Sequence, residues 1–83
     1  MPWRIEYKAS VQHDLRKIDR ADRKRIIDEL ETALSEDPNQ GELLTGPFKG
    51  LRKFRVGEYR VIYSKEKDGV LVLRIGHRST VYR

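Results

Sequence analysis

Basic side chains alternate with apolar ones in residues 51–63, a stretch suited to binding phosphate. Successive side chains of an extended strand point to opposite faces, so Lys53 and Arg55 share one face and the apolar residues between them share the other. Gly57 allows a tight reversal, and the β-branched and aromatic run that follows brings Arg60 back beside the first strand. Like charges held this close repel one another unless an anion is bound. We therefore expect the hairpin to bind a phosphate backbone.

The positive charge of the chain is concentrated in its second half. The formal net charge is +5, with 8 Lys and Arg against 10 Asp and Glu in residues 1–46, and 10 against 3 in residues 47–83. This asymmetry favours association with nucleic acid, with an acidic protein, or with both. The chain has no cysteine, and its two histidines have no acidic pair nearby. We therefore expect no disulfide, no metal site and no cofactor.

A length of 83 residues predicts a single domain that spans residues 1–83. No run approaches about 18 apolar residues, and no charged segment leads into an apolar one, so neither a membrane span nor a secretion signal is expected. We expect a cytoplasmic protein.

Two helices are predicted between residues 10 and 37, upstream of the hairpin. Ser10 and Asp19 are the predicted N-caps, and Pro38 ends the second helix because proline cannot continue the hydrogen-bond ladder. The very short join between the helices predicts an antiparallel helical hairpin. Apolar residues recur at helical spacing on one side of each helix, at Val11, Leu15 and Ile18 in the first, and at Ile26, Ile27, Leu30, Ala33 and Leu34 in the second.

Strands are predicted on both sides of these helices. Residues 3–7 alternate apolar with charged side chains, and residues 70–75 form an apolar run typical of a central strand. Residues 38–50 hold prolines and glycines typical of a loop, which Leu43, Leu44 and Phe48 are expected to attach to the core. These elements predict an α+β fold in the order β-α-α-β-β-β, with the helical hairpin packed on one face of a small, largely antiparallel sheet.

Residues 51–63, followed by Gly76-His77-Arg78 and by Val81-Tyr82, resemble the RelE group of the RelE/ParE toxin superfamily. The resemblance covers essentially the whole chain, and residues 57–63 and 76–78 are its most specific parts. It implies a RelE-like fold and the toxin half of a bacterial or archaeal type II toxin-antitoxin pair. It further implies a metal-independent endoribonuclease that inhibits translation by cutting mRNA in the ribosomal A site, through attack of the ribose 2′-hydroxyl on the adjacent phosphorus.

The same resemblance implies that five residues form the catalytic site. Cleavage requires a base for the 2′-hydroxyl, stabilisation of charge at phosphorus, and an acid for the departing 5′-oxygen. Arg60 and Arg78 suit the second task, because a guanidinium stays ionised and grips phosphate oxygens. Neighbouring arginines disfavour the charged form of Lys53, which makes it the candidate base, with Arg55 assisting it and holding the substrate. Tyr82 is expected to stack on a nucleobase.

A sixth residue, His77, is of the type best suited to proton transfer near neutral pH. Strand alternation places it opposite Arg78 if the strand continues that far, so a catalytic role is expected only if the strand ends at Gly76. Structural interpretations stay open for each candidate. The hairpin cations could form a solvated sheet face, Arg78 could protect a sheet edge, and Tyr82 could seal the core.

Two other functions stay open on the same fold. One is a ParE-like inhibitor of DNA gyrase, and the other is a module that binds RNA or an antitoxin without catalysis. The joint presence of Lys53, Arg60, Arg78 and Tyr82 favours the nuclease. The expected partners are the ribosome, mRNA and a cognate antitoxin whose acidic, amphipathic segment folds onto the basic surface.

Overall fold

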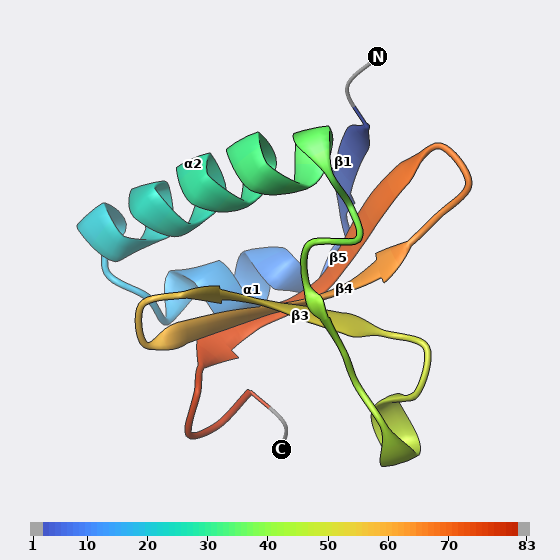
Figure 1. Ribbon diagram of the computed structural model, residues 1–83. Helices are drawn as coiled ribbons and strands as arrows, with labels where there is room; N and C mark the ends of the chain where they lie inside the picture. Colours follow the sequence, from blue (N-terminus) through green and yellow to red (C-terminus); the bar gives the residue numbers. More distant parts are fainter. Residues whose placement is uncertain (1–2, 82–83) are drawn as a thin grey trace.

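The computed structural model of the chain describes residues 3–81 and forms a five-stranded sheet with two helices (Figure 1). The sheet order is β1-β5-β4-β3-β2, in which β1 is parallel to β5 and the other neighbours are antiparallel. The predicted α+β class and largely antiparallel sheet are therefore confirmed. The elements are β1 (Arg4–Tyr7), α1 (Val11–Arg16), α2 (Arg20–Glu36), β2 (Glu42–Leu43), a 3₁₀ turn (Gly46–Phe48), β3 (Arg52–Val56), β4 (Tyr59–Lys65) and β5 (Gly69–His77).

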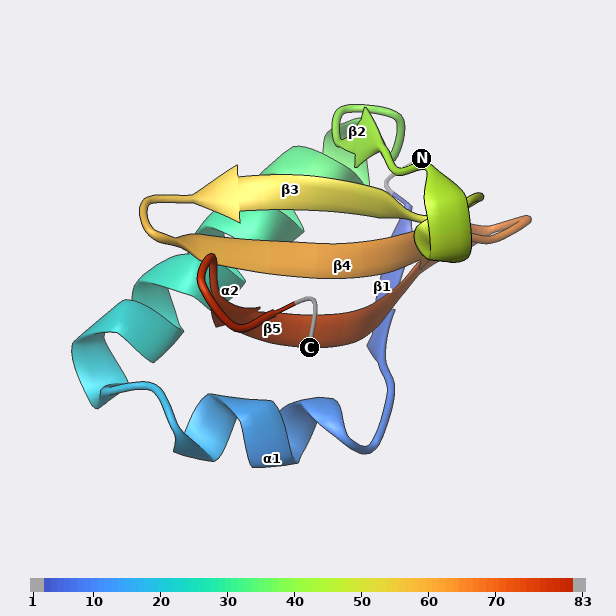
Figure 2. The same ribbon diagram turned by 90° about the horizontal axis from the view of Figure 1, so that it is seen from below.

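The helices cover the sheet in different ways. Helix α2 crosses one face, whereas α1 runs along the outer side of β5 (Figure 2). The side chain of Asp19 accepts a 2.8 Å hydrogen bond from the Asp22 N–H, which confirms the predicted N-cap of α2. Ser10 precedes α1 without a side-chain cap, and α1 ends before Ile18, which stays buried. No helix within residues 3–81 is both long and apolar enough to cross a bilayer.

The hydrophobic core lies between α2 and the face of the sheet that it covers. Ile26, Leu30 and Leu34 of α2 are each fully buried there, as are Val61 of β4 and Val72 of β5. These positions on α2 recur at intervals of four residues, so the predicted apolar stripe is the one that packs.

The second face of the sheet is partly covered by the segment that follows β5. Val81 is only 2% exposed, and Ile62 of β4 is only 3% exposed, although neither belongs to the main core. A Cβ atom built on Gly76 would lie 3.5 Å from the Val81 side chain. Val81 therefore holds the C-terminal segment against this face, where Figure 2 shows the chain turning back over β5.

The loop between α2 and β3 is attached through Tyr63, and of the three predicted anchors Leu44 and Phe48 are half-buried whereas Leu43 is not. The buried Tyr63 hydroxyl donates to the Pro38 carbonyl at 2.7 Å and accepts from the Gly41 N–H at 3.0 Å. Arg52 Nη1 donates to the Gly41 carbonyl at 2.8 Å. Leu43 is 57% exposed, so its expected anchoring role is wrong. Polar contacts to backbone groups, which leave no hydrophobic pattern, hold this loop.

The later half of β5 has no strand on its outer side, because β1 pairs only with Gly69–Val72. Helix α1 supplies the missing partner. The Asp14 carboxylate accepts a 3.1 Å hydrogen bond from the Ile75 N–H and lies 3.8 Å from Arg74 Nε. A side chain from α1 thus satisfies a sheet edge that would otherwise be open. This contact supports the end of β5, from which the functional residues project.

The hydrogen bond between Tyr7 of β1 and Glu31 of α2 predicts a loss of stability at alkaline pH. The Tyr7 hydroxyl donates to the Glu31 carboxylate. Burial, this hydrogen bond and the negative charge of Glu31 raise the pKa of Tyr7 above its ordinary value of 10.0. Because the pKa of Tyr7 is higher in the folded state, the stabilisation that its contact contributes is complete below the unfolded-state pKa. That stabilisation is lost as the pH rises through the folded-state pKa.

We therefore expect the free energy of unfolding, measured in urea, to fall as the pH rises above about 10. Tyr7→Phe should reduce this decline without removing it, because burial also raises the pKa of Tyr63 and Tyr59. An equal decline in the variant and the wild type would contradict the assignment to Tyr7.

Candidate functional site

The β3–β4 hairpin positions the cations as the sequence predicted. Arg55 pairs with Arg60 across the hairpin, and Lys53 pairs with Ile62, so Lys53, Arg55 and Arg60 belong to the face opposite α2. Gly57 has a φ of 57°, a conformation that L side chains rarely adopt. A glycine at this position therefore permits the two-residue turn that sets the register.

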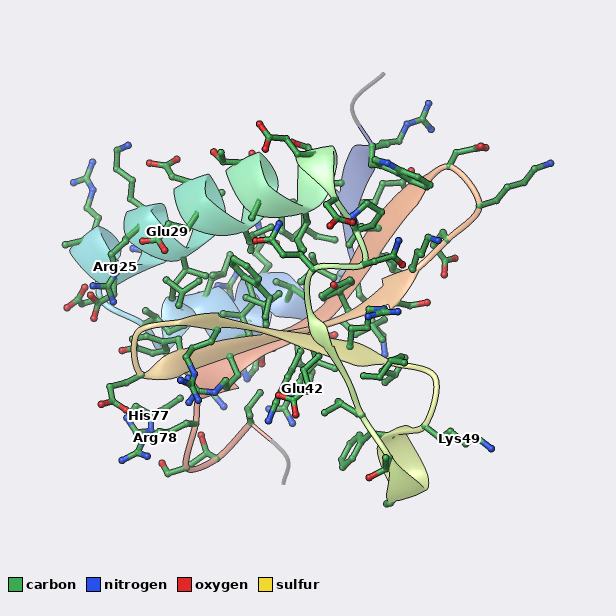
Figure 3. All side chains as sticks on the ribbon, in the orientation of Figure 1. Arg25, Glu29, Glu42, Lys49, His77 and Arg78 are labelled. Carbon is green, nitrogen blue, oxygen red and sulfur yellow. The ribbon has the colours of Figure 1, made fainter. Side chains whose placement is uncertain are left out.

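Lys53, Arg60 and Arg78 line one open pocket of about 410 Å³, together with His77 and Ser79. The first two come from adjacent strands and the other three from the end of β5 and the turn after it. His77 and Arg78 lie next to the β3–β4 turn, at one end of the sheet, in Figure 3. The pocket thus joins residues that are far apart in the sequence but meet at one end of the sheet.

Arg60 forms the buried side of this pocket and is only 9% exposed. Its Nη1 donates to the Gly57 carbonyl and to the Tyr59 carbonyl, each at 3.0 Å. Two neutral carbonyls orient the guanidinium, and no carboxylate among residues 3–81 forms an ion pair with it. Its charge is therefore fixed in place and available to an anion.

The two outer cations are paired with glutamates. Arg78 donates its backbone N–H to the Glu58 carbonyl at 2.8 Å, and its Nε lies 2.7 Å from Glu58 Oε2. Lys53 Nζ lies 3.6 Å from Glu42 Oε2 on β2. Both glutamate side chains are well exposed, at 63% and 74%. These ion pairs can open to solvent, unlike the hydrogen bonds of Arg60.

His77 belongs to the pocket, which the sequence did not predict. Strand β5 continues to His77, which pairs with Tyr59 of β4, so its ring lies on the Tyr59 side and not on the Arg60 side. His77 borders the pocket of Arg78 and also a second pocket that Tyr59 lines, and the expected separation of its ring from Arg78 stays a prediction. The chain turns directly after His77, whose carbonyl accepts from the N–H groups of Thr80 and Val81 at 3.0 Å, so alternation no longer applies to Arg78.

The orientation of the His77 ring is set by its neighbours. Its Nδ1 accepts the Ser79 N–H at 3.2 Å and lies 2.8 Å from Ser79 Oγ. The neutral ring therefore carries its proton on Nε2. Its centroid lies 5.8 Å from that of Tyr59 in an edge-to-face arrangement. The short spacing from Gly76 to Ser79, which allows a turn, was the available clue in the sequence.

Two of the predicted site residues are not part of this pocket. Arg55 is exposed on the correct face but does not line the pocket. Tyr82 lies outside the described residues. Within residues 3–81, no group of three His, Asp or Glu side chains is arranged to hold a metal ion.

Comparison with known proteins gives the family. Residues 5–82 match the family model described as the ParE toxin of type II toxin-antitoxin system, parDE. The chain belongs to this family. Toxin RelG of Mycobacterium tuberculosis is 28% identical over 86 residues, which cover 100% of this chain and 99% of RelG. The expected membership of the RelE/ParE superfamily is therefore confirmed, and the protein is a toxin of the type II toxin-antitoxin class.

Solved structures of this superfamily share the fold. The toxin-antitoxin complex RelBE2 from Mycobacterium tuberculosis matches with a TM-score of 0.83 and 26% identity, over 94% of this chain and 100% of that chain. A mutant of E. coli RelE in complex with a peptide of the antitoxin RelBc matches with a TM-score of 0.74 and 20% identity, over 93% of this chain and 84% of that chain. The predicted RelE-like arrangement of helices and sheet is thus confirmed.

Proposed function

We propose that this toxin is an endoribonuclease that cleaves mRNA in the ribosomal A site and so inhibits translation. The observation that carries the proposal is the pocket shared by Lys53, Arg60 and Arg78. The two guanidiniums beside one cavity match the charge that develops on a phosphate during cleavage, and the lysine beside them is the candidate base. The fixed position of Arg60 strengthens its stabilisation of this charge, because an oriented guanidinium needs little reorganisation during the reaction.

In the proposed reaction, Lys53 acts as the neutral amine. It removes the proton from a ribose 2′-hydroxyl and becomes an ammonium, and the 2′-oxygen attacks the adjacent phosphorus. Arg60 and Arg78 stabilise the negative charge of the pentacoordinate intermediate. The bond from phosphorus to the 5′-oxygen breaks, the departing oxygen takes a proton from solvent, and Lys53 later returns its own proton to solvent. The products are a 2′,3′-cyclic phosphate and a free 5′-hydroxyl, so no water or external reactant is consumed.

The proposed regulator is a cognate antitoxin that carries an acidic, amphipathic segment. Two observations support it. The RelBE2 structure of Mycobacterium tuberculosis is a complex of a toxin with its antitoxin, and residues 47–83 of this chain are strongly basic. An acidic segment that folds over the pocket would neutralise the cations on which the proposed cleavage depends.

The decisive experiment uses translating ribosomes on a defined mRNA, with primer extension to map the breaks. We expect breaks within the codon at the A site, and far slower cleavage of the same RNA without ribosomes. Lys67→Ala is the matched control for charge, because Lys67 is an exposed cation in the β4–β5 turn, at the opposite end of β4 from the pocket. This variant should cut at the wild-type rate.

A second candidate, inhibition of DNA gyrase, is favoured by the match to the ParE family model. A supercoiling assay run beside the ribosome assay separates the two. Loss of supercoiling without RNA breaks would replace the nuclease proposal with gyrase inhibition. If the protein shows neither effect, the remaining interpretation is a module that binds RNA or antitoxin without catalysis.

A further inference from the structure

Two of the three pocket cations are already occupied by carboxylates of the same chain. Glu58, in the β3–β4 turn, contacts Arg78 at 2.7 Å, and Glu42, on β2, lies 3.6 Å from Lys53. Both glutamates come from segments that border the pocket and neither lines it. A carboxylate and a phosphate offer an arginine the same kind of paired oxygen acceptors. These glutamates therefore hold positions where RNA phosphate oxygens would otherwise bind.

We propose that Glu58 competes with the RNA backbone for Arg78, so that RNA must displace its carboxylate to enter the pocket. This inference rests on the proposed function, since it names the group that limits RNA binding at the same site. Glu42 acts on Lys53 in the same way, more weakly because its contact is longer. Arg60 has no such competitor among residues 3–81, so it binds phosphate first.

The geometry suits displacement of Glu58 rather than permanent pairing. The Arg78 and Glu58 side chains are 62% and 63% exposed, so water replaces their contact at little cost. The backbone bond from the Arg78 N–H to the Glu58 carbonyl does not involve the carboxylate. The turn and the tail therefore stay attached when the carboxylate swings away, and Arg78 stays at the pocket.

Such competition weakens binding of RNA that is free in solution. A flexible strand has to displace Glu58 and also lose conformational freedom, whereas an mRNA already held in place by a ribosome loses less on binding. The cost of displacing Glu58 is the same for both, so it lowers the occupancy of weakly bound free RNA more than that of tightly held RNA. Glu58 thus limits RNA binding and takes no part in catalysis.

The test is Glu58→Gln, which keeps the size of the side chain and removes its charge. Binding is measured by fluorescence anisotropy with a labelled single-stranded RNA whose 2′-hydroxyls are methylated, so that it cannot be cleaved. We expect binding tighter by about two- to fivefold, the range for an exposed ion pair. We also expect the slope of log K against log[salt] to steepen by about 0.7, because Arg78 gains one phosphate contact.

Two comparisons isolate the competition from a general change in charge. Glu29→Gln removes an exposed carboxylate from α2, away from the pocket in Figure 3, and should change neither affinity nor slope. In an Arg78→Ala background, Glu58→Gln should no longer tighten binding. Unchanged or weaker binding of Glu58→Gln, or equal tightening by Glu29→Gln, would overturn the inference. Because the RNA is not cleaved, this outcome is independent of whether the toxin cuts mRNA on ribosomes.

Discussion

Arg60→Ala is expected to reduce A-site cleavage by about 10²- to 10³-fold, the usual loss when one oriented donor to a developing anion is removed. Arg60 is the pocket cation whose position is best fixed, because it is 9% exposed and two backbone carbonyls orient its guanidinium. No carboxylate within residues 3–81 forms an ion pair with it, so its charge is available to the substrate. The measurement is the single-turnover rate of mRNA cleavage on saturated ribosomes.

The same substitution removes two hydrogen bonds from the β3–β4 turn, so stability needs a separate measurement. Thermal unfolding followed by circular dichroism gives it, and cleavage is measured well below the midpoint. Arg78→Ala provides an independent variant, because Arg78 is 62% exposed and its loss should leave the fold unchanged. Wild-type cleavage by both folded variants would exclude the proposed reaction at this pocket.

The hairpin at the centre of the site was predictable because its information is local. Alternation in residues 51–63 and a glycine at 57 determine the turn, the register and the shared face of Lys53 and Arg60. The N-cap at Asp19 was predictable for the same reason, since capping needs only the neighbouring residues.

The features that the sequence did not predict depend on long-range contacts. Strand β2 has two residues and no pattern of its own, and it exists because β3 pairs with it. The parallel pairing of β1 with β5 is a choice of partner that alternation cannot specify. Arg78 and Ser79 reach the pocket because the chain turns directly after β5 at His77. For Arg55, alternation gave the correct face, but it does not determine in which direction along that face a long side chain points.

Leu30→Ala is expected to produce the largest loss of stability. Leu30 lies in the middle of α2, is fully buried, and packs against the sheet core. Removing a buried leucine side chain costs the transfer free energy of its carbons and leaves a cavity, together about 2–5 kcal/mol. A domain of this size has a free energy of unfolding of about 4–12 kcal/mol. A single substitution could therefore remove half or more of it, as measured by urea unfolding.

Leu43→Ala is the matched control, because it makes the same chemical change at a leucine that is 57% exposed. It should alter the free energy of unfolding by no more than about 0.5 kcal/mol. Leu30 belongs to α2, which covers the face of the sheet opposite the pocket. The cleavage rate per folded molecule should therefore be unchanged in Leu30→Ala. In Arg60→Ala, by contrast, the cleavage rate should fall even though the protein is folded. A Leu30→Ala protein as stable as the wild type would contradict the central place of α2 in the core.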